Sequence, residues 1–206
     1  MIAKGSGYVR GNREASSARL GAHFKYVEHR SKDEEKETRD DRRIYSKDED
    51  VVSRQDAMDD VMSHTSTSVN YHKIVLSPGE DEPIQDWREW TRDVMHDLEE
   101  EQGKELHWYA VNHNNTDNPH VHVVVAGAGE DHKTGETEPV KLYKEDYAVL
   151  RESGHEHSEY EHYHQIRELV KEYDAQEHME PSLERDLSSR DRASPPDSHE
   201  RGEYDR

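Results

Sequence analysis

The sequence predicts an α+β fold in which helices pack on one face of an antiparallel β-sheet. Two observations lead to this prediction. Short segments with apolar residues at every second position indicate strands, and longer segments with apolar residues every third or fourth position indicate helices. Two strand-like segments are joined by a short polar loop, which is typical of an antiparallel hairpin. We expect three or four strands, with a cluster of histidines on the face away from the helices.

The N-terminal segment predicts one strand and one helix. A short strand is expected around residues 7–10, and a helix that begins at Ser16 or Ser17 runs to about residue 30. The buried stripe of this helix recurs at helical spacing, at Leu20, Phe24 and Val27. Tyr26 lies about 200° round the helix from this stripe's centre, among basic residues, so it is either a surface residue or a functional one.

The middle of the chain predicts a loop, two helices and a strand. Residues 31–50 form a charge run that predicts an exposed loop, with a short strand at 43–46. Ser53 can cap a helix that ends near residue 63. A strand is expected over residues 71–76, and a helix over residues 83–103, with its terminal glycine as the C-cap.

The hairpin is predicted from two alternating strands, residues 106–112 and 120–125. Pairing around the loop between them places His113 opposite His120, and cross-strand partners lie about 4.5–5.5 Å apart on one face of a sheet. His122 shares that face because side chains alternate along a strand. The three imidazoles therefore form one cluster on one side of the sheet.

Three convergent imidazoles suit a divalent metal ion with positions left open for water or substrate. The alternative is a histidine-rich surface without an ion, in a chain with 16 histidines. The opposite strand face favours the metal site, because three valines there predict a buried, firmly held strand, and rigid elements position sites accurately.

The C-terminal part predicts two helices and a tail. Residues 127–137 indicate a polar turn, residues 140–143 an extended segment, and residues 145–153 a helix closed by Gly154. A last amphipathic helix is expected over residues 163–173. The composition then becomes polar and charged, which predicts disorder. We therefore expect a folded domain over residues 1–178 and a disordered acidic tail over residues 179–206.

The net charge of −20, with 37% charged and 30% hydrophobic residues, predicts a folded core under a very acidic surface. Such a surface is typical of a protein from a halophilic archaeon or from its plasmid or virus; the alternative is acidic disordered segments. Residues 1–31 differ, because six Lys and Arg residues stand against two Glu residues, a net charge of +4. This basic segment is what contact with nucleic-acid phosphates requires.

Two absences limit the function further. The chain has no cysteine, which excludes disulfides and thiolate metal ligands. No apolar run approaches the ~20 residues that cross a bilayer, and the N-terminus lacks the apolar core of a signal peptide. We therefore expect a cytoplasmic protein without a membrane segment.

The block HNNTDNPHVHVVV, residues 113–125, resembles the third motif of HUH-type endonucleases, specifically the relaxases of conjugative and mobilisable plasmids. Those enzymes nick one DNA strand with a tyrosine and keep the 5′ phosphate attached. The resemblance implies the HUH endonuclease fold, and Mg²⁺ or Mn²⁺ held by His113, His120 and His122. Many members have Asp where this chain has Asn115. Asp117 or Glu80 is the expected carboxylate that orients a ligand histidine or accepts a proton.

Two further segments resemble relaxase motifs. Residues 23–30 resemble the first motif, which implies that Tyr26 is the nucleophile, and residues 1–4 fit the family's first strand. Residues 77–80 resemble the second motif, which implies that Ser77 contacts the DNA backbone. Three basic residues of the first helix are expected to position the backbone: Arg19, Lys25 and Arg30. Tyr8 is a second candidate nucleophile, although its position favours an ordinary strand aromatic.

Three functions stay open at this point. The first is a DNA strand transferase that binds single-stranded DNA at an origin of transfer, with accessory DNA-binding proteins as further partners. The second is a rolling-circle replication initiator or related transposase, in which the tyrosine follows the metal motif; Tyr143 and Tyr147 occupy that order. The third is an accessory protein that binds DNA or metal without catalysis.

Overall fold

The computed structural model describes residues 1–29, 42–113, 118–160 and 165–171. The chain divides into a compact unit, Met1–Tyr163, and a second unit, His164–Arg206. In the second unit residues 165–171 are helical and exposed. The predicted domain boundary at residue 178 and the predicted tail lie outside the described residues and stay predictions.

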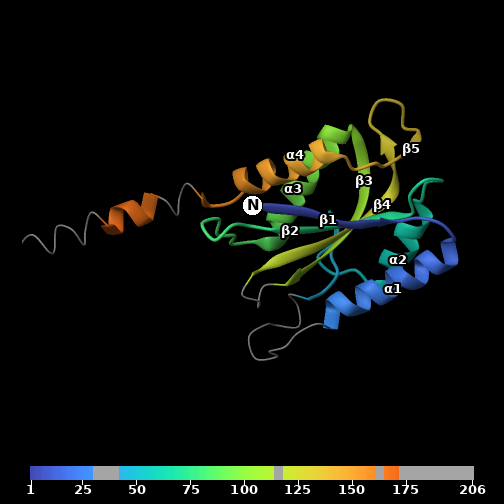
Figure 1. Cartoon of the computed structure of the whole chain (residues 1–206), viewed down its shortest axis with the longest axis horizontal. Helices are drawn as coiled ribbons and strands as arrows, with labels where there is room; N and C mark the ends of the chain where they lie inside the picture. The colour runs from blue at the N-terminus through green and yellow to red at the C-terminus, as the bar shows by residue number, and fades with distance from the viewer. Residues whose placement is uncertain (30–41, 114–117, 161–164, 172–206) are drawn as a thin grey trace, which may run out of the picture. The chain divides into compact units, whose positions relative to one another are not determined.

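The compact unit is built on a five-stranded antiparallel sheet (Figure 1). The strands run in the order β1-β2-β4-β3, and β5 pairs with β4. Their bounds are β1 Ile2–Val9, β2 Tyr71–Ser77, β3 Lys104–His113, β4 His120–Asp131 and β5 Thr137–Pro139. The predicted α+β fold with an antiparallel sheet is confirmed. β4 is longer than predicted, and it continues to Asp131, through the first five residues of the segment 127–137 expected as a turn.

Helices cover both faces of the sheet, which corrects the prediction that they pack on one face alone. One face carries α1 (Arg13–His29) and α2 (Arg54–Ser63), and the other carries α3 (Trp87–Gln102) and α4 (Lys144–Glu156) (Figure 1). The reason lies in β4, where residues 123–126 are apolar on both sides of the strand and so need cover on both. The histidines at its start lie on the α1 side, so they do not face away from all helices.

Helix ends follow local capping, partly as predicted. Ser53 caps α2 by accepting the backbone N–H of Asp56, and Gly103 ends α3 in the left-handed conformation with φ 62°. Both predictions are confirmed. The start of α1 is different, because the side chain of Asn12 accepts the N–H of Ala15 there. The start of α3 also differs, because its cap is Asp86, after the predicted opening at residue 83.

The segment between α1 and α2 contains a buried anchor, although its composition predicts an exposed loop. Ile44 and Tyr45 are fully buried, and Tyr45 forms an isolated bridge with Ala110 on β3. The Tyr45 hydroxyl lies 2.6 Å from Asn112 Oδ1 and 3.0 Å from Thr91 Oγ1. Burial raises the pKa of this hydroxyl. The anchor therefore ties the loop to the end of β3, one residue before His113.

Tyr45→Phe is expected to lower the free energy of unfolding by about 1–3 kcal/mol, because the buried Asn112 oxygen loses its donor. Urea unfolding followed by circular dichroism measures the change. Tyr143→Phe is the matched control, since Tyr143 is 60% exposed, and its effect should stay within about 0.5 kcal/mol. Equal stability of Tyr45→Phe and the parent protein would contradict the anchor.

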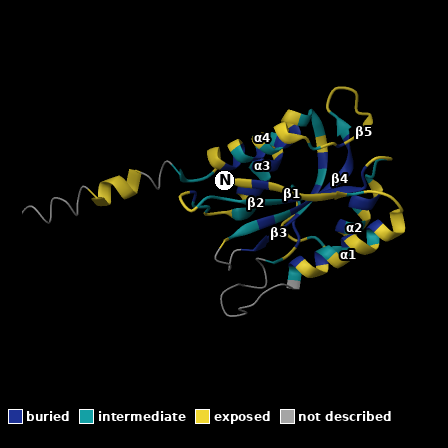
Figure 2. Ribbon diagram, viewed as in Figure 1, coloured by how far each residue is buried: buried dark blue, intermediate teal, exposed yellow. Residues whose placement is uncertain are grey.

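The C-terminal end of α4 packs against the start of the chain. Gly154 lies inside α4 and does not end it, which corrects the prediction. A Cβ at this position would lie 2.5 Å from Met1 Cε and 3.1 Å from Trp90, so glycine permits the close approach. Trp90 Nε1 donates to the Gly154 carbonyl at 3.0 Å. Figure 2 shows the buried residues gathered along the sheet, with exposed residues on the outer sides of the helices.

Within the described ranges, the structure contains no helix that is long and apolar enough to span a bilayer.

Candidate active site

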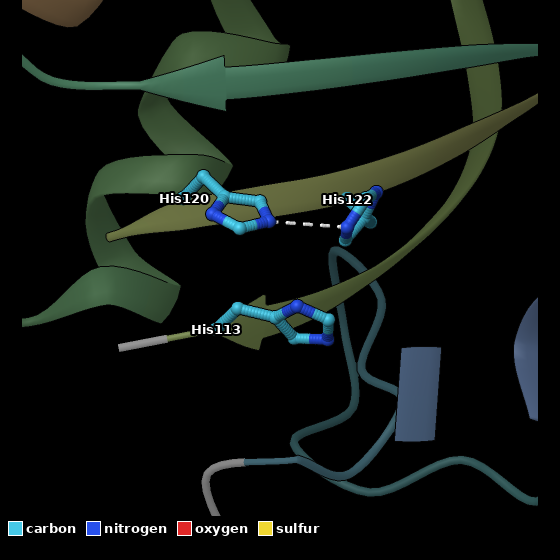
Figure 3. Close-up of side chains that lie close together, drawn as sticks. All are labelled: His113, His120 and His122. Carbon is cyan, nitrogen blue, oxygen red and sulfur yellow. Dashed lines mark hydrogen bonds between the residues drawn. The ribbon is translucent and has the colours of Figure 1, made fainter. Parts of the chain in front are cut away.

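The histidine cluster forms where β3 ends and β4 begins. His113 pairs with His120, and Val111 pairs with His122, so the predicted cross-strand register is confirmed. The ring centroids lie 5.1 Å apart for His113 and His120, 4.8 Å for His113 and His122, and 4.9 Å for His120 and His122. The three rings project toward one another from the two strands (Figure 3). One potential ligand atom from each lies within 4.8 Å of the others.

Main-chain carbonyls fix two of these rings. His113 Nε2 lies 2.6 Å from the Val27 carbonyl, and His120 Nδ1 lies 2.8 Å from the Asn118 carbonyl. A carbonyl only accepts, so each of these nitrogens carries the proton of its ring. The other nitrogen of each ring, Nδ1 of His113 and Nε2 of His120, is then free of a proton in the neutral form. Metal-ligating histidines are commonly oriented in this way.

The donor set fits a divalent cation. Nε2 of His120 and Nε2 of His122 lie 3.2 Å apart, a spacing close to that of two ligands about 2.1 Å from one ion. His113 is buried, and the other two rings are half-buried. Imidazole nitrogen suits Mn²⁺ better than Mg²⁺, which prefers oxygen ligands. In the described part of the chain this cluster includes no carboxylate.

The last turns of α1 lie against the cluster. Val27 supplies the carbonyl that accepts from His113, and the His23 ring stands 5.9 Å from the His122 ring in an edge-on arrangement. Burial, then the charges of Lys73 and His113, lower the pKa of His23 to about 4. His23 is thus neutral near pH 7. The sequence-based prediction missed it, although its place three residues before Tyr26 puts both on neighbouring turns of α1.

The tyrosines divide between the two sides of the sheet. Tyr26 follows His23 on α1, precedes Val27 and is 48% exposed. Tyr8 pairs with His72, whose Nε2 contacts the Val140 carbonyl in the core on the α3 and α4 side. Tyr147 lies on α4, in that same core. Tyr143, the fourth candidate, lies at the start of α4, so Tyr26 alone among the four lies on the element that contacts the histidine cluster.

Ser77 lies beside the hairpin at the end of β2. Its hydroxyl donates to the Pro119 carbonyl at 2.9 Å, directly before His120. Glu80 is exposed in the turn that follows and does not belong to the ligand cluster. Arg30, Asn115 and Asp117 lie outside the described residues. The predicted roles of Glu80, Asp117 and Arg30 therefore stay predictions.

Cationic side chains are present on elements of the sheet face that carries the cluster. Arg19 and Lys25 are exposed on α1, and their predicted contact with DNA stays a prediction. Lys73 on β2 was missed: it lies opposite Val124 of β4 and close enough to His23 to influence its pKa. Strand alternation could have identified it, because Lys73 and Ser77 are four residues apart and so share a face.

Comparison with protein families decides the assignment. The family model described as "Relaxase: MobA/VirD2-like, nuclease domain" matches residues 26–179, about three-quarters of the chain. The chain belongs to this relaxase family. The match begins at Tyr26 and includes the whole histidine hairpin. Neither curated proteins nor solved structures give a match to this relaxase.

Membership confirms the family resemblance read from the three motifs. The chain is therefore a relaxase-type nuclease, a class of enzyme that cuts and transfers DNA strands. Relaxases act with a divalent metal, and the histidine cluster of this relaxase has the matching donor set. An origin in a halophilic organism and a cytoplasmic location stay predictions.

Proposed function

We propose that this relaxase nicks single-stranded DNA at an origin of transfer, with Tyr26 as the nucleophile. One observation carries the proposal. The helix that bears Tyr26 is bonded to the histidine cluster through the adjacent residue, Val27, whose carbonyl accepts from His113 at 2.6 Å. A nucleophile and the group that binds the scissile phosphate need such a fixed spatial relation.

The residues divide the chemistry among them. When bound to His113, His120 and His122, Mn²⁺ or Mg²⁺ supplies Lewis-acid polarisation of the scissile phosphate. The Tyr26 oxygen forms a bond to phosphorus while the bond from phosphorus to the 3′ oxygen breaks. The products are a 5′-phosphotyrosyl bond and a free 3′-OH. Asp117 or Glu80 accepts the phenolic proton or orients a ligand histidine, and a proton is delivered to the departing 3′ oxygen.

We assign DNA binding to the predicted basic residues and to Ser77. Arg19, Lys25 and Arg30 contact backbone phosphates, and Ser77 contacts the backbone beside the hairpin. Lys73 joins this set because it shares the face of the cluster. These cations provide local attraction for phosphate on a protein with a net charge of −20.

The position of the tyrosines favours this arrangement over that of a replication initiator or transposase. Tyr147 lies in the core with α3 and α4, on the other side of the sheet from the histidines. We further propose that the biological setting is conjugation or mobilisation of a plasmid in the cytoplasm of a halophile, with accessory DNA-binding proteins at the origin.

The test is transfer of a DNA label to the protein. Labelled single-stranded oligonucleotides tile the origin of the genetic element that encodes the chain, and reactions contain Mn²⁺ or Mg²⁺ at molar KCl. A labelled band on a denaturing protein gel, lost with EDTA, is the expected result. Absence of a band on every strand, while Mn²⁺ binding is demonstrated, would overturn the proposal in favour of a non-catalytic accessory protein.

A further inference from the structure

The strand β1 presents an exposed lysine on the sheet face that carries the histidine cluster. Ala3 of β1 is buried in the core with α3 and α4, together with Leu76 of β2 and Val121 of β4. Side chains alternate along a strand, so the next residue, Lys4, projects from the opposite face of the sheet. That face carries α1 and the histidine cluster, and Lys4 is exposed on it.

A row of three side chains connects Lys4 with the histidine cluster. Lys4 pairs with Val75 of β2, and Val75 pairs with His122 of β4. Cross-strand partners share a face, and neighbouring strands lie about 4.8 Å apart. Lys4 is therefore two strand spacings, about 10 Å, from His122. Lys73 stands two residues before Val75 on β2, so it projects from the same face.

The helices on this face leave β1 largely exposed. The buried side of α1 packs over β3 and β4, where Val27 belongs to one core with Val111 and Val124. In contrast, β1 is exposed along most of its length (Figure 2), and its Ile2 is 48% exposed. The open surface beside the histidines is formed by four side chains, and we call it the basic floor: Ile2, Lys4, Lys73 and Val75.

The basic floor lies in a part of the chain without acidic side chains. Neither β1 nor β2 contains Asp or Glu, although the chain has 48 of these residues. Among the residues that the structure describes, no carboxylate forms an ion pair with Lys4 or Lys73. The two lysines are diagonal neighbours on adjacent strands, about 7–8 Å apart. Two cations at this spacing on an open surface favour a chain of phosphates over a single small anion.

We propose that single-stranded DNA runs from the histidine cluster across β2 to the edge of the sheet at β1, along the basic floor. Lys73 and Lys4 bind backbone phosphates beside the scissile phosphate, while Ile2 and Val75 contact sugars and bases. The position of the nick at the cluster rests on the proposed function. Lys4 acts in binding and not in bond breaking, because Val75 separates it from His122 in the row.

The chemistry of the basic floor indicates contact with DNA of any sequence. Proteins that bind single strands without reading sequence place cations along the backbone and offer flat or apolar contacts to the bases. The basic floor supplies two cations and two apolar side chains, and none of its four side chains is an amide or a carboxylate that would read base edges. Binding there should therefore depend strongly on salt and weakly on sequence.

The test is the affinity of the full chain for labelled oligo(dT), measured by fluorescence anisotropy in EDTA over a range of KCl concentrations. Lys4→Gln removes one phosphate contact, so Kd at about 0.1 M KCl should rise about fivefold. The slope of log Kd against log [KCl] should also fall by about 0.7. Ile2→Glu places a carboxylate on the basic floor and should raise Kd by a similar factor. Both positions are exposed, so neither change should alter the circular dichroism spectrum.

Two control variants separate charge and position from a general effect of substitution. Lys4→Arg keeps the positive charge and should restore the Kd and the salt slope of the parent protein. Lys133→Gln removes an exposed lysine from the turn after β4, away from the histidine cluster, and should change neither quantity.

Adduct formation on the origin strand distinguishes this proposal from the proposed function. Lys4→Gln should raise the DNA concentration that gives the half-maximal rate about fivefold, with the effect absent from the maximal rate. Parent-like Kd and salt slope in both Lys4→Gln and Ile2→Glu, or no oligo(dT) binding by the parent protein, would overturn the path along the basic floor even if the adduct forms. Weaker oligo(dT) binding by both variants without an adduct in the parent protein would contradict the proposed function alone.

Discussion

Tyr26→Phe is expected to abolish the covalent protein–DNA adduct and to lower nicking by at least about 10³-fold, because the variant has no oxygen to attack phosphorus. Tyr26 is 48% exposed, so loss of its hydroxyl should leave the fold intact. Label transfer from an oligonucleotide labelled on the 3′ side of the nick, read on a denaturing protein gel, measures adduct formation directly. Binding of the same DNA, measured by fluorescence anisotropy, should change much less.

The matched controls are two of the other candidate tyrosines. Tyr8 and Tyr147 both lie on the side of the sheet away from the histidine cluster. Tyr8→Phe and Tyr147→Phe should therefore keep the adduct. An adduct that persists in Tyr26→Phe but disappears in Tyr147→Phe would transfer the nucleophile to α4 and support the replication-initiator arrangement.

His122→Ala is expected to cause the second large effect, loss of Mn²⁺ binding together with loss of nicking. His122 is the ring that contacts His113, His120 and His23. Removing one of three ligands should weaken binding by more than the roughly 10–100-fold that loss of an outer-shell partner costs. Electron paramagnetic resonance of free Mn²⁺ during a titration measures the affinity.

His132→Ala serves as its control, because this exposed histidine lies in the turn after β4. It should leave both the affinity and the adduct unchanged. If His122→Ala bound Mn²⁺ as tightly as the parent protein while circular dichroism stayed normal, the three histidines would not be the ion's ligands.

The histidine cluster could be predicted because strand alternation and a short loop determine register almost alone. A shift of one residue would move His120 and His122 to the face of Val121 and Val123, which has to be buried. The helix that carries Tyr26 could also be predicted, since its stripe of Leu20, Phe24 and Val27 is buried as the spacing predicts. Both depend on local periodicity, which the sequence displays directly.

Features that depend on tertiary contacts were missed. The strand β4 extends through Ala126, Gly127 and Ala128, small residues that show no strand periodicity. Tyr45 is buried inside a charged segment because its hydroxyl donates to Asn112 Oδ1 and also contacts the hydroxyl of Thr91, both of them distant in sequence. The positions of Lys73 and His23 near the cluster depend on the packing of β2 and α1 beside the hairpin, which local periodicity does not show.

The contact between Val27 and His113 places only a weak constraint on the sequence of α1. The acceptor is a main-chain carbonyl, so any apolar residue that fills the same space at position 27 keeps the contact. Exposed positions on the same helix, including Arg19 and Lys25, are free of that constraint. Substitutions there can change the charge of the exposed side of α1 while the geometry of the histidines is kept.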